Sequence, residues 1–369
     1  MSRLARVAVL VATVGMVLGL AAGAQAAPPR VVKAAPATGA PAAGTAPAAP
    51  TRLTPDVNRT ATAQLKRAVD LNYSYRDLRK VNWDRLFAVA SPGLEQARTP
   101  AEYAEAAGRL LAEARDVHIW LTAGDATFGS HRRQAPLNAN LATLPRLVPG
   151  WTAHNDTVST GTFPDGIRYV LITAWDAARA KDLEPAFEAI GGADPARGII
   201  LDVRPNSGGS EPLARQVAGC FVEKPVVYSR NTTRTEGKVF GPYDRTLEPN
   251  AARPAYRGRV VVLMGPKNMS SCESFLMMMK QAPGCRLVGE RSYGSSGNPK
   301  PHALDNGVTV FLPSWEDLTP DGKILEGVGV EPDVKVRSSA EDFTKGDPVL
   351  EAALRLLRAP AAPLKPAAK

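Results

Sequence analysis

A serine-rich turn follows a short apolar segment in the second half of the chain. Val260–Met264 has the pattern of a buried strand, and Asn268, Ser270 and Ser271 follow it just before a helical pattern. A serine at a helix N-terminus lies beside unpaired backbone N–H groups, which can stabilise the oxyanion that forms when a hydroxyl attacks a carbonyl. Ser270 is therefore a candidate nucleophile, although taken alone the segment is better explained by Ser270 or Ser271 as a helix N-cap.

Two glycine-rich segments accompany this turn. The first, LDVRPNSGG at 201–209, runs from an apolar strand into a double-glycine turn, and glycine allows backbone N–H groups to approach a ligand closely. The second, at 319–333, combines TPDG with LEGVGVEPD. Alone, the first segment indicates an ordinary turn and the second a turn with an edge strand.

The segments that must position these residues alternate between strand and helix patterns. We expect strands over 167–174, 198–203, 259–264, 286–289 and 308–312, with helices over 182–190, 212–221 and 347–357. Such alternation predicts an α/β core with parallel strands. Residues 56–116 instead predict a small helical bundle, in which Thr99-Pro100-Ala101-Glu102 is a capping box, and 115–121 is a possible switch to a strand. Residues 131–165 fit no clear pattern.

Taken in order, four elements of the core resemble peptidase family S41, the tail-specific or C-terminal-processing proteases. IILDVRPNSGG is similar to LILDLRxNPGG of the family, NMSSCES to SASASE, LVGERSYGSSG to LVGExTFGKG, and TPDGKILEGVGVEPDVKV to TPxGxxIxGxGIxPDxxV. The resemblance is close over about 165–340. It implies a ClpP/crotonase-like α/β core, preceded here by the helical bundle, and hydrolysis of peptide bonds.

The resemblance assigns roles to individual residues. Ser270 takes the position of the nucleophile, and Ser271 supplies a backbone N–H to the oxyanion hole, with a second N–H from Gly208 or Gly209. Family members with a Ser-Lys dyad carry lysine where this chain has Ser295. A base must therefore come from elsewhere.

A tricorn-like branch of the family uses histidine from a segment before the core. RDVHIWL resembles that segment and makes His118 the expected base, with Glu326 of LEGVG as its supporting carboxylate. The serine that bridges the two in that branch is replaced by Val117. Lys300 and His302 stay open as alternative bases, and so does a site without a competent base.

The predicted boundaries follow from these patterns. They are a signal peptide (1–26), a disordered Ala/Pro-rich linker (27–55), a helical region (56–130), a connector (131–165), the S41 catalytic core (166–340), a C-terminal helix (341–358) and a disordered tail (359–369). About 45 residues separate His118 from the strand at 167, too few for the PDZ domain that many processing proteases insert there. Recognition of a free substrate C-terminus by such a domain is therefore not expected.

Composition narrows the function classes. Arg3 and Arg6 precede an apolar run and a small-residue cleavage site, which predicts export to a periplasm or outside the cell, without a membrane span after cleavage. The formal net charge of +9 falls to +7 without these two arginines, and the scattered basic residues favour a solubilising surface over nucleic-acid binding. No spacing of cysteine or histidine indicates a metal, and we expect no cofactor.

Three functions compete on this evidence. The leading one is an exported serine peptidase acting on peptides or proteins. The second is an inactive S41-like binding protein for peptides or apolar ligands, and the third an esterase-like acyl hydrolase. The substrate, the oligomeric state and any pairing among Cys220, Cys272 and Cys285 stay open.

Overall fold

The computed structural model describes residues 52–195 and 197–360, all of them within one compact unit. The predicted signal peptide, most of the predicted linker and nearly all of the predicted tail lie outside these residues. Among the described residues, no helix is long and apolar enough to cross a membrane. Cys220, Cys272 and Cys285 are buried free thiols.

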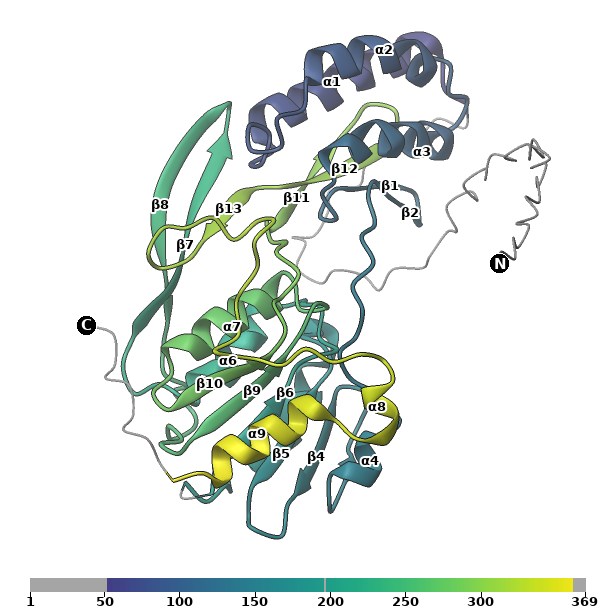
Figure 1. Cartoon of the computed structure of the whole chain (residues 1–369). Coiled ribbons are helices and arrows are strands. Elements are labelled where there is room, and N and C mark those ends of the chain that lie inside the picture. Colours follow the sequence, from purple (N-terminus) through teal and green to yellow (C-terminus); the bar gives the residue numbers. More distant parts are fainter. Residues whose placement is uncertain (1–51, 196, 361–369) are drawn as a thin grey trace, which may run out of the picture. The chain divides into compact units, whose positions relative to one another are not determined.

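The central sheet has seven strands in the order β14-β10-β9-β6-β5-β4-β3 (Figure 1). Strands β5, β6, β9, β10 and β14 run parallel, whereas β3, β4 and β5 are antiparallel. The predicted parallel α/β core is thus confirmed, and the 131–165 connector proves to contain both antiparallel strands. The bounds are β3 Thr152–Ala153, β4 Val158–Thr162, β5 Arg168–Ile172, β6 Ile199–Asp202, β9 Val260–Met264, β10 Cys285–Gly289 and β14 Val334–Lys335.

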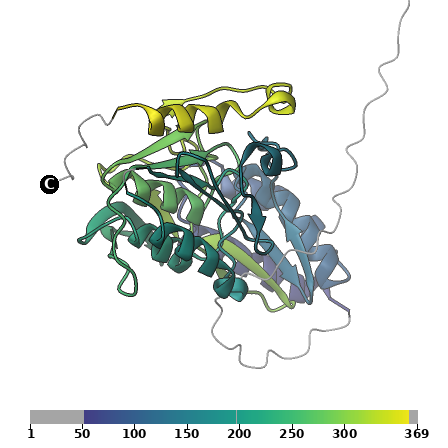
Figure 2. The same ribbon diagram turned by 90° about the horizontal axis from the view of Figure 1, so that it is seen from below.

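Helices cover both faces of this sheet, as Figure 2 shows. One face packs against α5 (Glu184–Gly191), α6 (Glu211–Gly219) and α7 (Ser271–Gln281), and a 3₁₀ turn, Ala177–Leu183, leads into α5. Met277, Met278 and Met279 are buried in this layer. The other face packs against α9 (Pro348–Arg358). Two single-turn helices, α4 (Leu144–Leu147) and α8 (Asp342–Lys345), complete the set.

The N-terminal helices pack on a second sheet. They are α1 (Pro55–Asn72), α2 (Trp83–Glu95) and α3 (Pro100–Leu111), followed by a 3₁₀ turn, Ala112–Ala114. The predicted cap is present, because the Thr99 hydroxyl accepts the Glu102 N–H at 3.2 Å. The sheet has the order β11-β12-β1-β2. Its strands are β1 Trp120–Ala123, β2 Ala126–Gly129, β11 Pro299–Ala303 and β12 Val308–Pro313.

The position of β12 corrects the sequence analysis. We expected 308–312 to be a fifth strand of the core, but β12 pairs antiparallel with β1 and β11 beneath the helices. Its alternation of buried and half-buried residues fits a sheet with one covered face. A third sheet, β13-β7-β8, was not expected at all. It consists of β7 Val226–Thr235, β8 Lys238–Leu247 and β13 Trp315–Leu318.

A fully buried arginine joins the core sheet to its C-terminal helix. Arg204 donates to Asp202 at 2.6 Å and to Asp347 at 2.7 Å, and both carboxylates are buried. Asp347 also caps α9 by accepting the N–H groups of Val349 and Leu350. Asp202, at the end of β6, is thus held by an ion pair.

Arg204→Ala should therefore destabilise the fold by about 3–5 kcal/mol, because two buried carboxylates would lose their counter-ion. Urea denaturation measures this loss. Arg179→Ala, which breaks the exposed pair with Asp156, serves as the control and should lose less than about 1 kcal/mol. Equal losses in the two variants would contradict the anchoring role of Arg204.

Candidate active site

Ser270 lies at a sharp turn between β9 and α7. Its backbone has φ 56° and ψ −132°, a conformation that side-chain-bearing residues rarely adopt, and it immediately precedes the first turn of the helix. Strained backbone of this kind is concentrated at functional sites. The side chain is partly exposed, and its hydroxyl makes no hydrogen bond within the described residues. The hydroxyl is therefore free to meet a ligand.

Two backbone N–H groups beside Ser270 are also free. Ser271 begins α7, so its N–H has no acceptor in the preceding turn. In the double-glycine turn, the Gly208 N–H donates to the Asn206 side chain at 2.8 Å. Among the described residues the Gly209 N–H has no acceptor. Of the three expected oxyanion donors, Ser271 and Gly209 are thus unoccupied, whereas Gly208 is engaged.

The double-glycine turn lies directly against the candidate nucleophile. A Cβ added to Gly208, whose φ is 109°, would lie 3.0 Å from the Ser270 Cβ and 3.3 Å from the Ser271 nitrogen. Asn268 holds the two loops together, because its side-chain amide donates to the carbonyls of Val203 at 2.6 Å and Asn206 at 3.0 Å. Only glycine permits this close approach.

His118 is buried and contacts Ser295. Its Nδ1 lies 2.9 Å from the Ser295 Oγ, and its backbone N–H donates to Asp116 at 2.9 Å. The backbone carbonyl of Ser295 in turn accepts the Ser270 N–H at 2.7 Å. Ser295 therefore links the candidate base to the candidate nucleophile, although no hydrogen bond joins His118 to Ser270 directly.

The environment of His118 favours the neutral imidazole. Burial lowers the pKa of His118, the nearby Asp116 carboxylate opposes this, and the Arg79 cation adds to the lowering. When Nδ1 carries the proton and donates to Ser295, the lone pair on Nε2 is available to accept a proton.

A buried carboxylate holds the loop that carries Ser295. Glu273, in the first turn of α7, accepts the Ser292 hydroxyl and the N–H groups of Gly294 at 2.7 Å and Ser295 at 2.9 Å. Burial raises the pKa of Glu273 to about 7, although these three donors oppose the shift. The helix that begins at the nucleophile thus also fixes the residue that contacts His118.

Glu326 does not contact His118. One of its oxygens accepts from Arg79 and the other accepts the Ser296 N–H at 3.0 Å. Arg79 also lies 3.5 Å from Asp116. Glu326 is therefore connected to His118 indirectly, through Arg79 and Asp116 and also through Ser296 and its neighbour Ser295. Burial raises the pKa of Glu326 to about 8, with a further rise from Asp116, whereas Arg79 lowers it.

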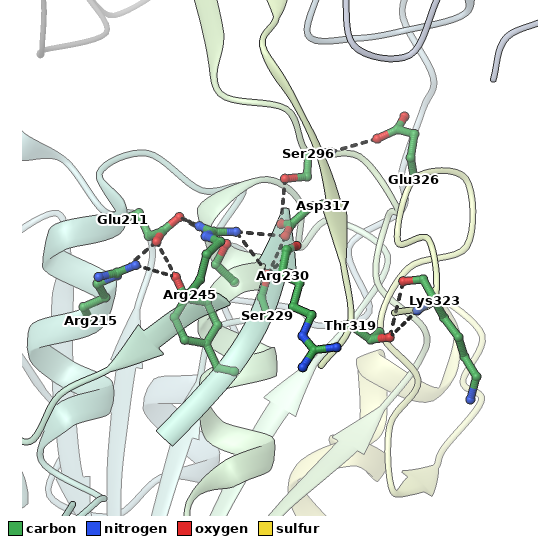
Figure 3. Close-up of polar contacts among 12 residues, drawn as sticks. Glu211, Arg215, Ser229, Arg230, Arg245, Ser296, Asp317, Thr319, Lys323 and Glu326 are labelled. Atoms are coloured by element: carbon green, nitrogen blue, oxygen red, sulfur yellow. Dashed lines mark hydrogen bonds and ion pairs between the residues drawn. The ribbon is translucent and has the colours of Figure 1, made fainter. Parts of the chain in front are cut away.

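A chain of buried polar groups leads from Glu326 to the double-glycine turn (Figure 3). The Ser296 hydroxyl donates to Asp317 of β13 at 3.0 Å, and Asp317 accepts from Arg245 of β8 at 2.8 Å. Arg245 also pairs with Glu211, which begins α6 just after Gly209. The three-stranded sheet therefore holds both the loop that carries Ser296 and the double-glycine turn in place.

Lys300 and His302 lie away from this cluster. Both belong to β11, opposite Leu312 and Val310 of β12, and neither bonds to Ser270. Arg79, Asp116, Glu273 and Ser295 were not expected from the sequence to have a role at the site. The S-x-x-E spacing of Ser270 and Glu273 was the one signal for Glu273. Ser295 was noted only as a missing lysine.

Comparisons with known proteins show which proteins this chain resembles. Residues 166–336 match the model of peptidase family S41. The chain is 26% identical over 190 residues to the carboxy-terminal processing protease CtpA of Bacillus subtilis, covering 52% of this chain and 39% of that protein. It is 25% identical over 171 residues to the carboxy-terminal processing protease CtpB of the same organism, covering 46% of this chain and 34% of CtpB. Residues 166–336 of this chain are therefore similar to peptidase family S41.

Solved structures support the S41 fold. A proposed peptidase from Parabacteroides merdae superposes with a TM-score of 0.70 at 24% identity, covering 83% of this chain and 98% of that one. The tricorn protease superposes with a TM-score of 0.53 at 14% identity, covering 82% of this chain and 36% of that one. At these identities the likeness shows the fold alone. The chain spans about two fifths of the length of the curated relatives that it matches.

The raised pKa of Glu326 predicts a pH-dependent stability. Because the folded-state pKa of about 8 exceeds the ordinary 4.5, the neutral acid stabilises the fold at low pH, and this contribution is lost as the pH rises through 8. Between pH 5 and 8.5, we expect the wild type to lose about 4 kcal/mol relative to Glu326→Gln. Urea denaturation at both pH values measures this, and Glu273 cancels because both proteins contain it. A pH-independent difference would contradict the assignment.

Proposed function

We propose that this chain is an exported serine peptidase with Ser270 as nucleophile and His118 as base. The observation that carries the proposal is the double role of Ser295, whose hydroxyl contacts His118 and whose carbonyl accepts the Ser270 N–H. The similarity of residues 166–336 to peptidase family S41 supports the reaction class. Export rests on the predicted signal at 1–26.

In the proposed first step, the Ser270 Oγ bonds to the carbonyl carbon of the scissile peptide. The Nε2 of His118 takes the hydroxyl proton, and the carbonyl π electrons move to the oxygen. The N–H groups of Ser271 and Gly209 stabilise this oxyanion. Catalytic hydrogen bonds often form only when substrate is bound, which accounts for the open contact between His118 and Ser270.

In the second step, the C–N bond breaks as His118 returns the proton to the leaving amine. Water then attacks the acyl-enzyme ester while His118 takes its proton. His118 returns this proton to the Ser270 oxygen as the ester C–O bond breaks and the acid product leaves. Ser295 orients the imidazole, a role that carboxylates have in the usual triad. Glu326 and Arg79 act indirectly. They position Asp116, whose carboxylate accepts the backbone N–H of His118.

A fluorophosphonate probe tests the nucleophile and the base. We expect the wild type to be labelled at Ser270, and both Ser270→Ala and His118→Ala to lose the label, because attack on phosphorus requires the activated hydroxyl. Lys300→Ala and His302→Ala are matched controls that should label normally. An unlabelled wild type would favour the binding-protein alternative, and faster turnover of small esters than of peptides would favour an acyl hydrolase.

Ser295→Ala tests the orienting role. With the fluorogenic peptide that the wild type turns over, we expect kcat to fall about 10- to 100-fold while KM changes little, because the imidazole loses its partner but the substrate does not. Ser295→Thr keeps the hydroxyl and should restore most of kcat. If threonine rescued nothing, or if KM rose instead, the hydroxyl would have no part in orienting His118.

A further inference from the structure

A cavity of about 750 Å³ has Arg79 in its wall. Its wall comes from the connection between α1 and α2, the start of α2, and the residues just before Asp116. Four basic residues line it, together with one acidic residue and four aliphatic side chains between positions 78 and 89. The charged residues are Arg79, Lys80, Arg85, Arg115 and Glu113.

Most of this positive charge is uncompensated. Lys80, Arg85 and Arg115 are exposed, and within the described ranges none of them forms an ion pair. Many other arginines at the surface do, including Arg59 with Asp56 and Arg109 with Glu105. Cations that converge on one concave surface without a partner raise the local concentration of anions.

The backbone also shapes this cavity unusually. Lys80 and Arg115, on opposite segments of its wall, have φ values of 53° and 51°. They are two of the five side-chain-bearing residues with positive φ among those described, and Ser270 is another. Such conformations persist where the surroundings enforce them. The two left-handed turns place both cations in the wall of one cavity.

Arg79 connects this cavity to the candidate site. It lines the cavity, pairs with the buried Glu326, and lies 3.5 Å from Asp116, whose carboxylate accepts the backbone N–H of His118. A ligand in the cavity would therefore lie one side chain away from the groups that position the base. This adjacency points to a segment of the substrate.

We propose that the cavity binds an acidic segment of the polypeptide substrate, in which carboxylates alternate with aliphatic residues. The carboxylates pair with Lys80, Arg85 and Arg115, and the aliphatic side chains pack on the apolar part of the wall, where Val89 is 74% exposed. A small inorganic anion would leave that apolar part uncovered. The inference rests on the proposed peptidase function and adds a substrate preference to it.

Binding can be measured without turnover. A fluorescein-labelled decapeptide that alternates glutamate with leucine is titrated with the Ser270→Ala protein, and fluorescence anisotropy reports the Kd. The same labelled decapeptide with glutamine in place of each glutamate is the uncharged control. We expect the glutamate peptide to bind at least about tenfold more tightly, and its affinity to fall between about 50 and 300 mM salt, because exposed charges are screened.

Charge reversal then locates the site. Lys80→Glu/Arg85→Glu should weaken binding of the glutamate peptide at least about tenfold. Arg67→Glu/Lys181→Glu, at exposed and unpaired positions elsewhere, changes the net charge equally and should leave the Kd within about twofold. Equal binding of the two peptides, or equal losses in the two double variants, would overturn the proposal. Because Ser270 is already replaced, neither result depends on the protein being a peptidase.

Discussion

The buried Glu273 carboxylate ties the helix that begins at Ser270 to the loop that faces it. It accepts three hydrogen bonds from residues 292–295, and leaving buried donors of this kind unpaired would cost about 1–3 kcal/mol each. The loop cannot move away from α7 without that loss. The position of Ser295, and through it the orientation of His118, therefore depends on a carboxylate that bonds to neither the Ser270 hydroxyl nor the His118 imidazole.

The remaining architecture brings distant segments to this point. The strand order places β6 beside β9, so the turns that follow them, with Gly208 and Ser270, meet at one edge of the sheet. His118 comes from the segment between the N-terminal helices and β1. Strand β1 pairs with β12, and β12 pairs with β11, the strand that follows the loop carrying Ser295. The buried chain from Glu326 through Asp317 to Glu211 then fixes these loops to the three-stranded sheet.

Many of the strands and helices could be predicted from local patterns in the sequence. Strands β5, β6, β9 and β10 are apolar runs beside turn residues, and α3 begins at a capping box, so their signals lie within a few residues. The three-stranded sheet escaped prediction because β8 is mostly exposed and polar, and its pairing is set by contacts far apart in sequence. Ser270, His118 and Glu326 were identified through the resemblance. The contact between His118 and Ser295 spans 177 positions, and the contact between Arg79 and Glu326 spans 247, so neither has a local signal in the sequence.

The central claim is that Ser295 holds His118 in the tautomer that leaves Nε2 free. Two-bond ¹H–¹⁵N spectra of the imidazoles at neutral pH report this state directly, and His118→Gln assigns the signal among the four histidines of the chain. The account predicts a neutral His118 with the proton on Nδ1, and loss of that fixed tautomer in Ser295→Ala. A proton on Nε2, or an imidazolium at neutral pH, would contradict it.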